Sequence, residues 1–373
     1  MKMKDIARKA GVSEASVCLA LNGHPRVSQA MSQKVLKVAK DLGYKHQNRR
    51  RAKSSRGIRT GYIGLLYVGL PAELTRSPFF IRFVSSLESH LSGEGLQLLL
   101  AQVPDPNELP KNIRASRMDG AFLIGRDPDP AIMRDLEEIH TVGVFGRPRP
   151  DLDWVTTNAS QHGRLAGEYL LGRGHRRLGF LNPDRAHNVF AEYGRAFQET
   201  LASHGVEASM LIAQEAHPDR AFWTRRHYRE VIEGLLRGYF LTPAQERPTG
   251  MYVANDEIAL VTYQVLADHG VRGGMDIEIV SNDNDESLLS VLTPRPATIE
   301  PHYDEIAGRA LGKLLYRIEH PDAPPGAQLL IPPKLIAPNG SDRGTLVQPA
   351  VAIAADDRGV FCRRSQTFAS PLP

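Results

Sequence analysis

The chain has few cysteines, and this shortage excludes several classes of protein. Its 373 residues include only two cysteines, Cys18 and Cys362, which lie in different regions of the sequence. Two distant cysteines cannot form the disulfide framework of a small secreted domain, and their spacing matches no metal site. We therefore expect reduced thiols, no metal, no other cofactor and a cytoplasmic location.

Long apolar segments and catalytic fingerprints are also missing. No run of 18 or more apolar residues occurs, so no membrane-spanning helix is expected. The basic N-terminus lacks the apolar segment of a secretory signal, which again favours the cytoplasm. The patterns G-x-S-x-G, H-E-x-x-H, Walker A and G-x-G-x-x-G do not occur, and no two carboxylates pair at a defined strand end. The sequence therefore does not predict an enzyme.

What the chain does contain is a pattern of three short helices over residues 3–44. Gly11 can end the first helix, and Ser13 can cap the second by accepting a backbone N–H. Ser28 can cap the third, which ends at Gly43. The apolar positions expected to face inward in the third helix are Val35, Leu36, Val38, Ala39 and Leu42.

Charge is distributed very unevenly along the chain. Residues 1–60 hold 15 Lys and Arg against 3 Asp and Glu, a net charge of +12. The remaining residues hold 31 against 39, a net charge of −8. Any small helical bundle can show the apolar pattern of residues 3–44, but a strongly basic one on an acidic body indicates a helix-turn-helix DNA-binding headpiece.

The same stretch, DIARKAGVSEASVCLALNGHPRVSQAMSQKVLKVAKDLGY, resembles the headpiece of the lactose-repressor/galactose-repressor (LacI/GalR) family. The similarity runs through all three helices, from D-I-A through A-G-V-S and L-N-G to L-G-Y. It implies that double-stranded DNA is the partner and that the second helix enters the major groove. The residues expected to contact DNA are Ser13, Glu14, Ala15, Ser16, Leu19, Asn22, Arg26, Ser28, Arg49, Arg50, Arg51 and Lys53.

Three of these residues stand where the family reads bases: Glu14, Ala15 and Leu19. The position of Leu19 is commonly Arg in the family, and Arg can hold guanine through two hydrogen bonds. Leu19 can make only apolar contacts, whereas Glu14 can accept a hydrogen bond from cytosine. The resemblance therefore implies an operator half-site that differs from the usual one opposite Leu19.

Residues 46–60 are polar and strongly basic. They form either a flexible solvated tether or a hinge that neutralises phosphates and lies in or on the minor groove. The family inserts a Leu from this hinge between base pairs, and the corresponding position here is near Lys53, which cannot act as an apolar wedge. The run Arg49-Arg50-Arg51 can substitute for it through phosphate or minor-groove contacts.

From residue 61 the pattern changes to alternating strands and helices, which predicts an α/β body with parallel sheets. The order occurs twice along the chain, so two α/β subdomains are expected. The strands predicted are 62–68, 95–103, 119–124, 142–145, 177–181, 251–254 and 277–281. The helices predicted between them are 79–91, 159–171, 193–203 and 257–269.

This body also resembles the family, in segments such as RMDGAFLIG, RLAGEYLLGRGHRRLGFL and PTGMYVANDEIALVTYQVLADHG. The resemblance implies a periplasmic-binding-protein-like fold over 61–341, with three crossovers between the subdomains and a small molecule in the cleft. It places 61–158 and 294–322 in one subdomain, and 159–293 and 323–341 in the other. The tail, 342–373, has no clear periodicity and either adds a strand or stays disordered.

Ligands of parallel α/β sheets bind beyond the carboxyl ends of the strands, which directs attention to the polar residues there. Asn255 and Asp283 can contact ligand, although capping of the next helix, with Asp256 as the capping residue, is the competing role at 255–256. Arg126 and Arg147 either supply charge to the cleft or are solvated. Trp223 either stacks on a sugar ring or packs in the core. The candidate effector-binding residues are Phe79, Arg126, Arg147, Asn158, Tyr193, Trp223, Asn255 and Asp283.

Two of these positions depart from the family pattern. Asn158 replaces an acid that often precedes the central helix, and Tyr193 replaces an Arg. The expected pocket therefore has less charge and more amide and aromatic character, so its ligand need not be a common sugar of the family.

Two other functions compete with that of a ligand-responsive repressor. A solute-binding protein shares the body fold, but the basic headpiece and the absence of a signal segment argue against it. An enzyme is disfavoured by the missing fingerprints. A headpiece covers only one half-site, so the sequence predicts a homodimer on a pseudo-palindromic operator whose affinity a sugar or related metabolite modulates.

Overall fold

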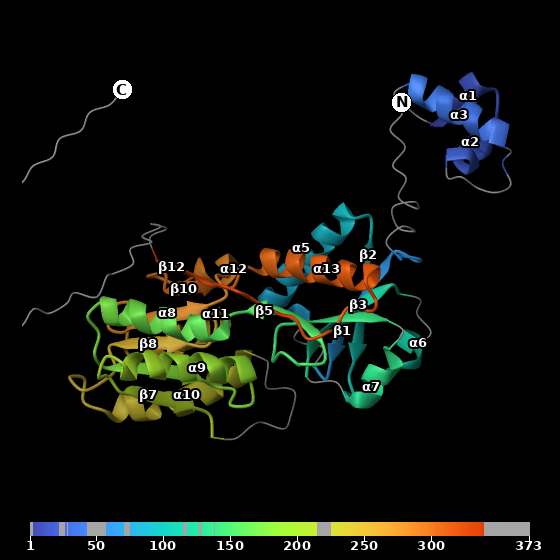
Figure 1. The fold of residues 1–373 in the computed structure, drawn as a ribbon. Coiled ribbons are helices and arrows are strands. Elements are labelled where there is room, and N and C mark those ends of the chain that lie inside the picture. Colours follow the sequence, from blue (N-terminus) through green and yellow to red (C-terminus); the bar gives the residue numbers. More distant parts are fainter. Residues whose placement is uncertain are drawn as a thin grey trace, which may run out of the picture. The chain divides into compact units, whose positions relative to one another are not determined.

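A computed structural model describes most of the chain (Figure 1). The described residues are 3–21, 27, 29–42, 57–70, 75–114, 118–126, 129–137, 139–214 and 225–338. Among them, no helix is long and apolar enough to cross a membrane. The residues of the predicted tail, 342–373, lie outside the described part.

The headpiece contains the three expected helices, α1 (Met3–Ala10), α2 (Glu14–Leu21) and α3 (Gln29–Asp41). Ile6, Val17 and Val35, one from each helix, are fully buried at their common centre. Gly11 ends α1 with a φ of +64°, a conformation that glycine adopts without a steric penalty. The prediction that Leu36 faces inward was wrong, because its side chain is 50% exposed. Val35 and Ala39, four residues apart, form the buried stripe of α3, and Leu36 points about 100° away from Val35, on the side directed to solvent.

The first sheet of the body has six strands in the order β11-β5-β4-β3-β1-β2, and all its pairings are parallel. Helices α5 and α13 pack together against one face, over a core that includes Phe83, Leu87 and Leu314 (Figure 1). The strands are β1 (Tyr62–Val68), β2 (Gln97–Val103), β3 (Gly120–Gly125), β4 (His140–Val144), β5 (Asp153–Thr157) and β11 (Gln328–Ile331). The helices are α5 (Pro78–Gly93), α6 (Lys111–Arg114), α7 (Pro130–Asp135) and α13 (Tyr303–Glu319).

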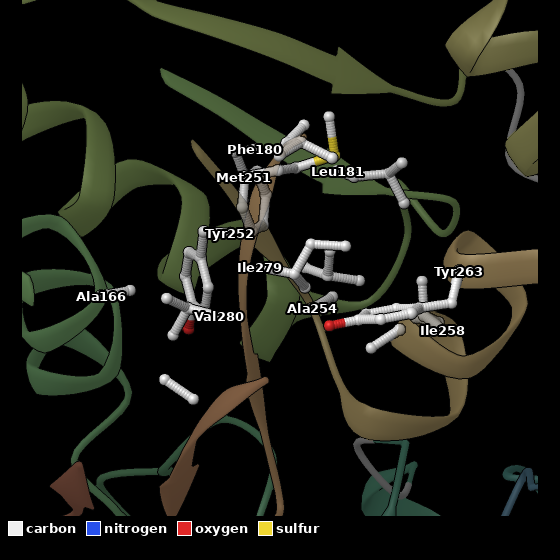
Figure 2. Packing of buried hydrophobic residues seen from close by; sticks show 14 of the residues in the cluster. Ala166, Phe180, Leu181, Met251, Tyr252, Ala254, Ile258, Tyr263, Ile279 and Val280 are labelled. Carbon is white, nitrogen blue, oxygen red and sulfur yellow. The ribbon is translucent and has the colours of Figure 1, made fainter. Parts of the chain in front are cut away.

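The second sheet repeats this order as β12-β10-β9-β8-β6-β7, with β12 antiparallel to β10. Its core fills both faces: Figure 2 shows Tyr252 and Val280 toward Ala166 of α8, and Ile258 and Tyr263 of α11 on the other side. The strands are β6 (Leu178–Asn182), β7 (Ala208–Ile212), β8 (Gly250–Val253), β9 (Glu278–Asn282), β10 (Ala297–Glu300) and β12 (Lys334–Ile336). The helices are α8 (Ala159–Gly172), α9 (Asn188–Ala202), α10 (Arg225–Leu241), α11 (Asp256–Asp268) and α12 (Glu286–Leu289).

The predicted subdomain boundaries need correction at two of the three crossovers. Strand β10, assigned to the first subdomain through 294–322, pairs with β9 in the second sheet. Strand β11, assigned to the second subdomain through 323–341, pairs with β5 in the first sheet. The chain therefore crosses at Asn158, at 301–302 and at 332–333. We call residues 57–157 and 303–331 half 1, and residues 159–300 and 334–338 half 2.

The last part of the predicted linker, 57–60, belongs to the body. Ile58 is 5% exposed and packs in the core of half 1. The carboxylate of Asp119 accepts hydrogen bonds from the backbone N–H groups of Arg59, at 2.7 Å, and Thr60, at 2.9 Å. The polar composition of residues 46–60 concealed this anchor, because the groups that bind the segment come from the beginning of β3.

Candidate functional site

The N-terminus of α2, where DNA contacts are predicted, is fixed by a side-chain cap. Ser13 Oγ accepts a hydrogen bond from the backbone N–H of Ser16 at 3.1 Å, which confirms Ser13 as the capping residue. Glu14, the first residue of the helix, is exposed, whereas Val17 and Ala20 are buried against the other two helices. The helix thus presents its first turn away from the headpiece core.

Several predicted contact residues fall outside the described part of the chain, and their assignment stays a prediction. The side chains of Ala15 and Leu19 are not described, although both residues lie in α2. The other residues outside the described part are Asn22, Arg26, Ser28, Arg49, Arg50, Arg51, Lys53 and, in the body, Trp223.

In each half, the first strand along the chain pairs with the second strand on one side and with the third strand on the other. The strand order therefore reverses between β1 and β3 in half 1 and between β6 and β8 in half 2. Such a reversal opens a crevice at the carboxyl ends of the strands, where α/β proteins bind ligands. Arg126 follows β3 and is exposed, and Asp184 follows β6 and is buried. Burial raises the pKa of Asp184, and the positive charge of Arg126 opposes that rise. A cation of half 1 and a carboxylate of half 2 thus follow strand ends next to the two strand-order reversals.

Asp283 lies just beyond β9, where the sequence predicted a ligand contact, and its φ is +100°. Its carboxylate accepts a hydrogen bond from Tyr303 Oη at 2.8 Å, and its carbonyl oxygen accepts one from the Arg82 guanidinium. Burial raises the pKa of Asp283 to about 6, and the negative charges of Glu300 and Asp285 add to this, while Tyr303 and Arg82 oppose it. A non-glycine residue in this backbone conformation is strained, and such strain is concentrated at functional sites.

An aromatic cluster surrounds Tyr303, whose hydroxyl binds this carboxylate. The Tyr303 ring centroid lies 5.9 Å from that of Phe79 and 5.8 Å from that of Phe145, and Phe79 and Phe145 meet edge to face at 5.6 Å. Phe145 follows β4 with a φ of +57°, and its carbonyl accepts a hydrogen bond from Trp154 Nε1. The predicted residue Phe79 is therefore part of an aromatic cluster that includes Tyr303, which binds the Asp283 carboxylate. Aromatic rings and a carboxylate together suit a hydroxylated ring, which can stack and form hydrogen bonds.

Tyr193 and Asn158 occupy the same region but have largely structural contacts. The Tyr193 ring is buried and stacks on His162 with centroids 4.7 Å apart. Burial raises the pKa of Tyr193 well above its ordinary value, and the charge of Asp283 contributes to the rise. Asn158 Oδ1 accepts the backbone N–H of Gln161 at 3.3 Å and caps α8. Tyr193 is thus near enough to Asp283 for the charge of that carboxylate to affect it, whereas Asn158 supports the helix.

The prediction that Asp256 caps α11 was wrong, because Asn255 has that role. Asn255 Oδ1 accepts the backbone N–H of Ile258 at 2.9 Å. Asp256 is fully buried and accepts hydrogen bonds from Thr298 Oγ1 at 3.0 Å and from the backbone N–H of Asp285 at 2.7 Å. Its side chain joins Thr298 of β10 to Asp285, three residues after β9. Ligand contact by Asn255 stays a prediction.

One further site residue was predicted from the sequence, and four others were not. Arg147, two residues after Phe145, is exposed. Arg82, His162, Asp184 and Tyr303 were not predicted. Arg82, His162 and Tyr303 belong to helices, and only Asp184, which follows β6, fits the strand-end rule. No group of three or more His, Cys, Asp or Glu in the described residues could hold a metal ion.

Replacing Asp283 by Asn should stabilise the protein at pH 7.5 and not at pH 4.5. Because the folded-state pKa is raised, the native state binds more protons than the unfolded state between about pH 4 and 6. The free energy of unfolding therefore falls as pH rises through this window, and Asn removes that loss. We expect a gain of about 1–2 kcal/mol at pH 7.5 in urea unfolding. The exposed carboxylate of Asp322 provides the control, Asp322→Asn, and an equal gain at both pH values would contradict the argument.

Comparison with known proteins agrees with both parts of this structure. Residues 2–47 match the model of the bacterial regulatory proteins of the lacI family, and residues 168–337 match that of a periplasmic binding protein-like domain. The ribose operon repressor of Escherichia coli (strain K12) is 28% identical over 327 residues, covering 86% of this chain and 93% of that protein. The HTH-type transcriptional repressor PurR of Mannheimia succiniciproducens is 24% identical over 331 residues, covering 86% and 93%.

Solved structures show the same fold. The complex of the transcriptional regulator CelR with cellobiose aligns with a TM-score of 0.62 at 22% identity, covering 90% of this chain and 98% of that one. The Lac repressor bound to ONPG aligns with a TM-score of 0.63 at 20% identity, with the same coverage. The regions matched by the two family models together span more than half of the sequence. The chain belongs to the LacI family of DNA-binding transcriptional regulators, with a LacI-type headpiece and a periplasmic-binding-protein-like body.

Proposed function

We propose that this protein represses transcription as a homodimer and that a small hydroxyl-rich molecule, a sugar or a related metabolite, changes its affinity for the operator. The observation that carries the ligand class is the half-buried carboxylate of Asp283, which Tyr303 binds while its ring packs against Phe79 and Phe145. A carboxylate accepts hydrogen bonds from two hydroxyl groups, and aromatic rings cover the apolar face of a sugar ring. A regulator of this kind acts on the chromosome, so we assign it to the cytoplasm.

The dimer follows from the reach of one headpiece. A single helix in the major groove contacts a few base pairs, so usable affinity comes from two headpieces on a pseudo-palindrome. A ligand that binds one arrangement of the two halves better than another shifts the population able to hold both headpieces on DNA. Repression is supported by the relatives, which are repressors rather than enzymes.

The ligand proposal is tested by screening sugars and nucleosides for a thermal shift and measuring the best ligand by calorimetry. Asp283→Asn should weaken binding at least tenfold, since a hydrogen bond to a charged group contributes about 1.5–3 kcal/mol. Operator affinity without ligand should change less than about twofold, because the headpiece contacts are untouched. Asp322→Asn is the control on an exposed carboxylate. Wild-type ligand affinity in Asp283→Asn would move the site elsewhere.

Phosphate contacts by the linker form a separate prediction. Changing Arg49, Arg50 and Arg51 together to Ala should weaken binding to operator and to random DNA alike. The slope of log affinity against log salt should become shallower by roughly 0.9 for each phosphate that is no longer neutralised, or about 3 for all three residues. The corresponding triple Lys variant keeps the charge and should retain the slope. An unchanged slope in the Ala variant would show that these side chains do not contact phosphate.

A further inference from the structure

A buried histidine lies where the three crossovers between the halves meet. His162, in the first turn of α8, is fully buried. Its Nε2 lies 2.7 Å from Oγ1 of Thr157, the last residue of β5 before the first crossover. Its Nδ1 lies 2.8 Å from Oδ1 of Asn282, the last residue of β9 and the neighbour of Asp283. One ring thus joins the end of a half 1 strand to the strand end that carries the predicted ligand contact.

The third crossover contacts the residues of the first crossover that adjoin this ring. The carbonyl of Ile331, at the third crossover, accepts the backbone N–H of Asn158 at 2.8 Å and lies 3.5 Å from Thr157 Oγ1. Burial lowers the pKa of His162 to about 4, the hydrogen bond with Asn282 opposes this fall, and the charge of His302, at the second crossover, adds to it. His162 is therefore neutral at pH 7, with one ring nitrogen that donates and one that accepts.

A single backbone carbonyl determines which nitrogen carries the proton. The Ala254 carbonyl can only accept, so the Asn282 side-chain atom 2.8 Å from it must be the amide nitrogen. Asn282 Oδ1 then faces His162 and must accept, which places the proton on Nδ1. Nε2 is left as the acceptor, and the hydroxyl of Thr157 must donate to it. Every donor in this buried hydrogen-bond network has an acceptor. A fully satisfied network of this kind favours one arrangement of the structure.

We propose that His162 is a positioning residue that holds the first crossover against the end of β9, next to Asp283. The arrangement of the two halves and the orientation of the Asp283 carboxylate therefore change together. Its consequence for ligand response rests on the function proposed above, but its test uses no ligand and no DNA. Failure of the test would therefore leave the repressor proposal standing, and failure of the ligand screen would leave this proposal standing.

The proton position is tested by NMR on protein labelled with ¹³C,¹⁵N-histidine. The chain has 13 histidines, so the His162 signals are assigned by their disappearance in His162→Phe. We expect Nδ1 to be protonated and Nε2 to have the shift of an unprotonated acceptor at pH 7. A proton on Nε2, or on both nitrogens, would overturn the network.

The positioning role is tested by the distance between the halves. Spin labels at Glu88→Cys in α5 and Gln198→Cys in α9, both exposed positions, report it in the full chain with Cys18→Ser and Cys362→Ser. Mixing with a tenfold excess of unlabelled protein pairs most labelled protomers with an unlabelled partner, so the measured distance lies within one protomer. Pulsed electron–electron double resonance should give one narrow distance for this background.

Two further variants in that background make the test decisive. His162→Phe keeps the ring and removes both hydrogen bonds, while Thr157→Val removes only the Nε2 contact. Each variant should add a second distance, because the lost hydrogen bonds favour one arrangement of the halves by an energy of order 1 kcal/mol or more. In His162→Phe, at least about one third of the molecules should show the second distance. The control is Tyr169→Phe, which removes the 2.9 Å hydrogen bond to Glu278 within half 2 and should leave the distance unchanged. An unaltered distribution in Thr157→Val and in folded His162→Phe would overturn the proposal. If His162→Phe does not fold, Thr157→Val decides alone.

Discussion

Replacing Gly163 by Ala should destabilise the body by about 3 kcal/mol, a large effect for the addition of one methyl group. A Cβ built at Gly163 would collide with the carbonyl oxygen of Tyr193 and lie 2.6 Å from the backbone nitrogen of Phe197. Both are backbone atoms of α9, so the clash is relieved only when α8 and α9 move apart. A Cβ added at Gly167, one turn later, would lie 3.0 Å from Cγ2 of Thr200 in α9, so the contact between the helices runs along a seam of small residues.

A matched glycine makes this prediction specific. Gly234 lies inside α10, and no atom is within 4 Å of a Cβ added there. Gly234→Ala should stabilise the protein by up to about 1 kcal/mol, because Ala is the better helix former. Urea unfolding of both variants measures the difference. If Gly163→Ala is as stable as Gly234→Ala, the two helices are not in backbone contact at this point.

The close approach of α8 and α9 also shapes the site. Gly163 follows His162, and the Tyr193 carbonyl that excludes a side chain at 163 belongs to the residue whose ring stacks on His162. Separating the helices would part these two rings and shift the neighbours of Asp283. We therefore expect Gly163→Ala to weaken ligand binding as well as stability. The small residue is required by the architecture of the site, which no local property of the sequence reveals.

Strands buried on both faces were predictable because their sequences are nearly continuous apolar runs. The expected strand 62–68 coincides with β1, which lies inside the first sheet between β3 and β2. Strand β5, with the sequence DWVTT, was missed although it is wholly buried. Its Asp153 accepts the backbone N–H of Ala327 at 2.8 Å, and its other oxygen lies 3.5 Å from Lys313 Nζ. These partners are more than 150 residues away, so the sequence around Asp153 contains no sign that its burial is compensated.

The residues of the site likewise divide into those that the sequence predicts and those that it does not. The rule that ligands bind past the ends of parallel strands identified Asp283 and Arg126. It could not identify Arg82 or Tyr303, because both lie in helices of half 1 and reach Asp283 only through the crossover arrangement. The incorrect subdomain boundary had the same origin, since residues 294–300 alone do not indicate that β10 pairs with β9.

The most specific prediction concerns the operator and the residue at position 19 of α2. The capped start of the helix at Glu14 and the buried Val17 and Ala20 define its orientation in the headpiece. The helical period predicts that residue 19 lies off the buried stripe, on the face directed toward the major groove. Leucine there can contact a thymine methyl group but cannot form hydrogen bonds with guanine.

Leu19→Arg should therefore create a preference for guanine at one symmetric pair of operator positions. A bidentate Arg–guanine contact contributes roughly 1–3 kcal/mol of discrimination, so affinity for the matching site should exceed that for other bases by about 5- to 150-fold per half-site. Selection from random DNA with the wild type and the variant gives the two preferred sites, and Leu19→Met is the control that keeps an apolar side chain. A preference that changes at this pair alone would locate residue 19 in the groove. Identical selected sites for wild type and Leu19→Arg would mean that the helix meets DNA through another face.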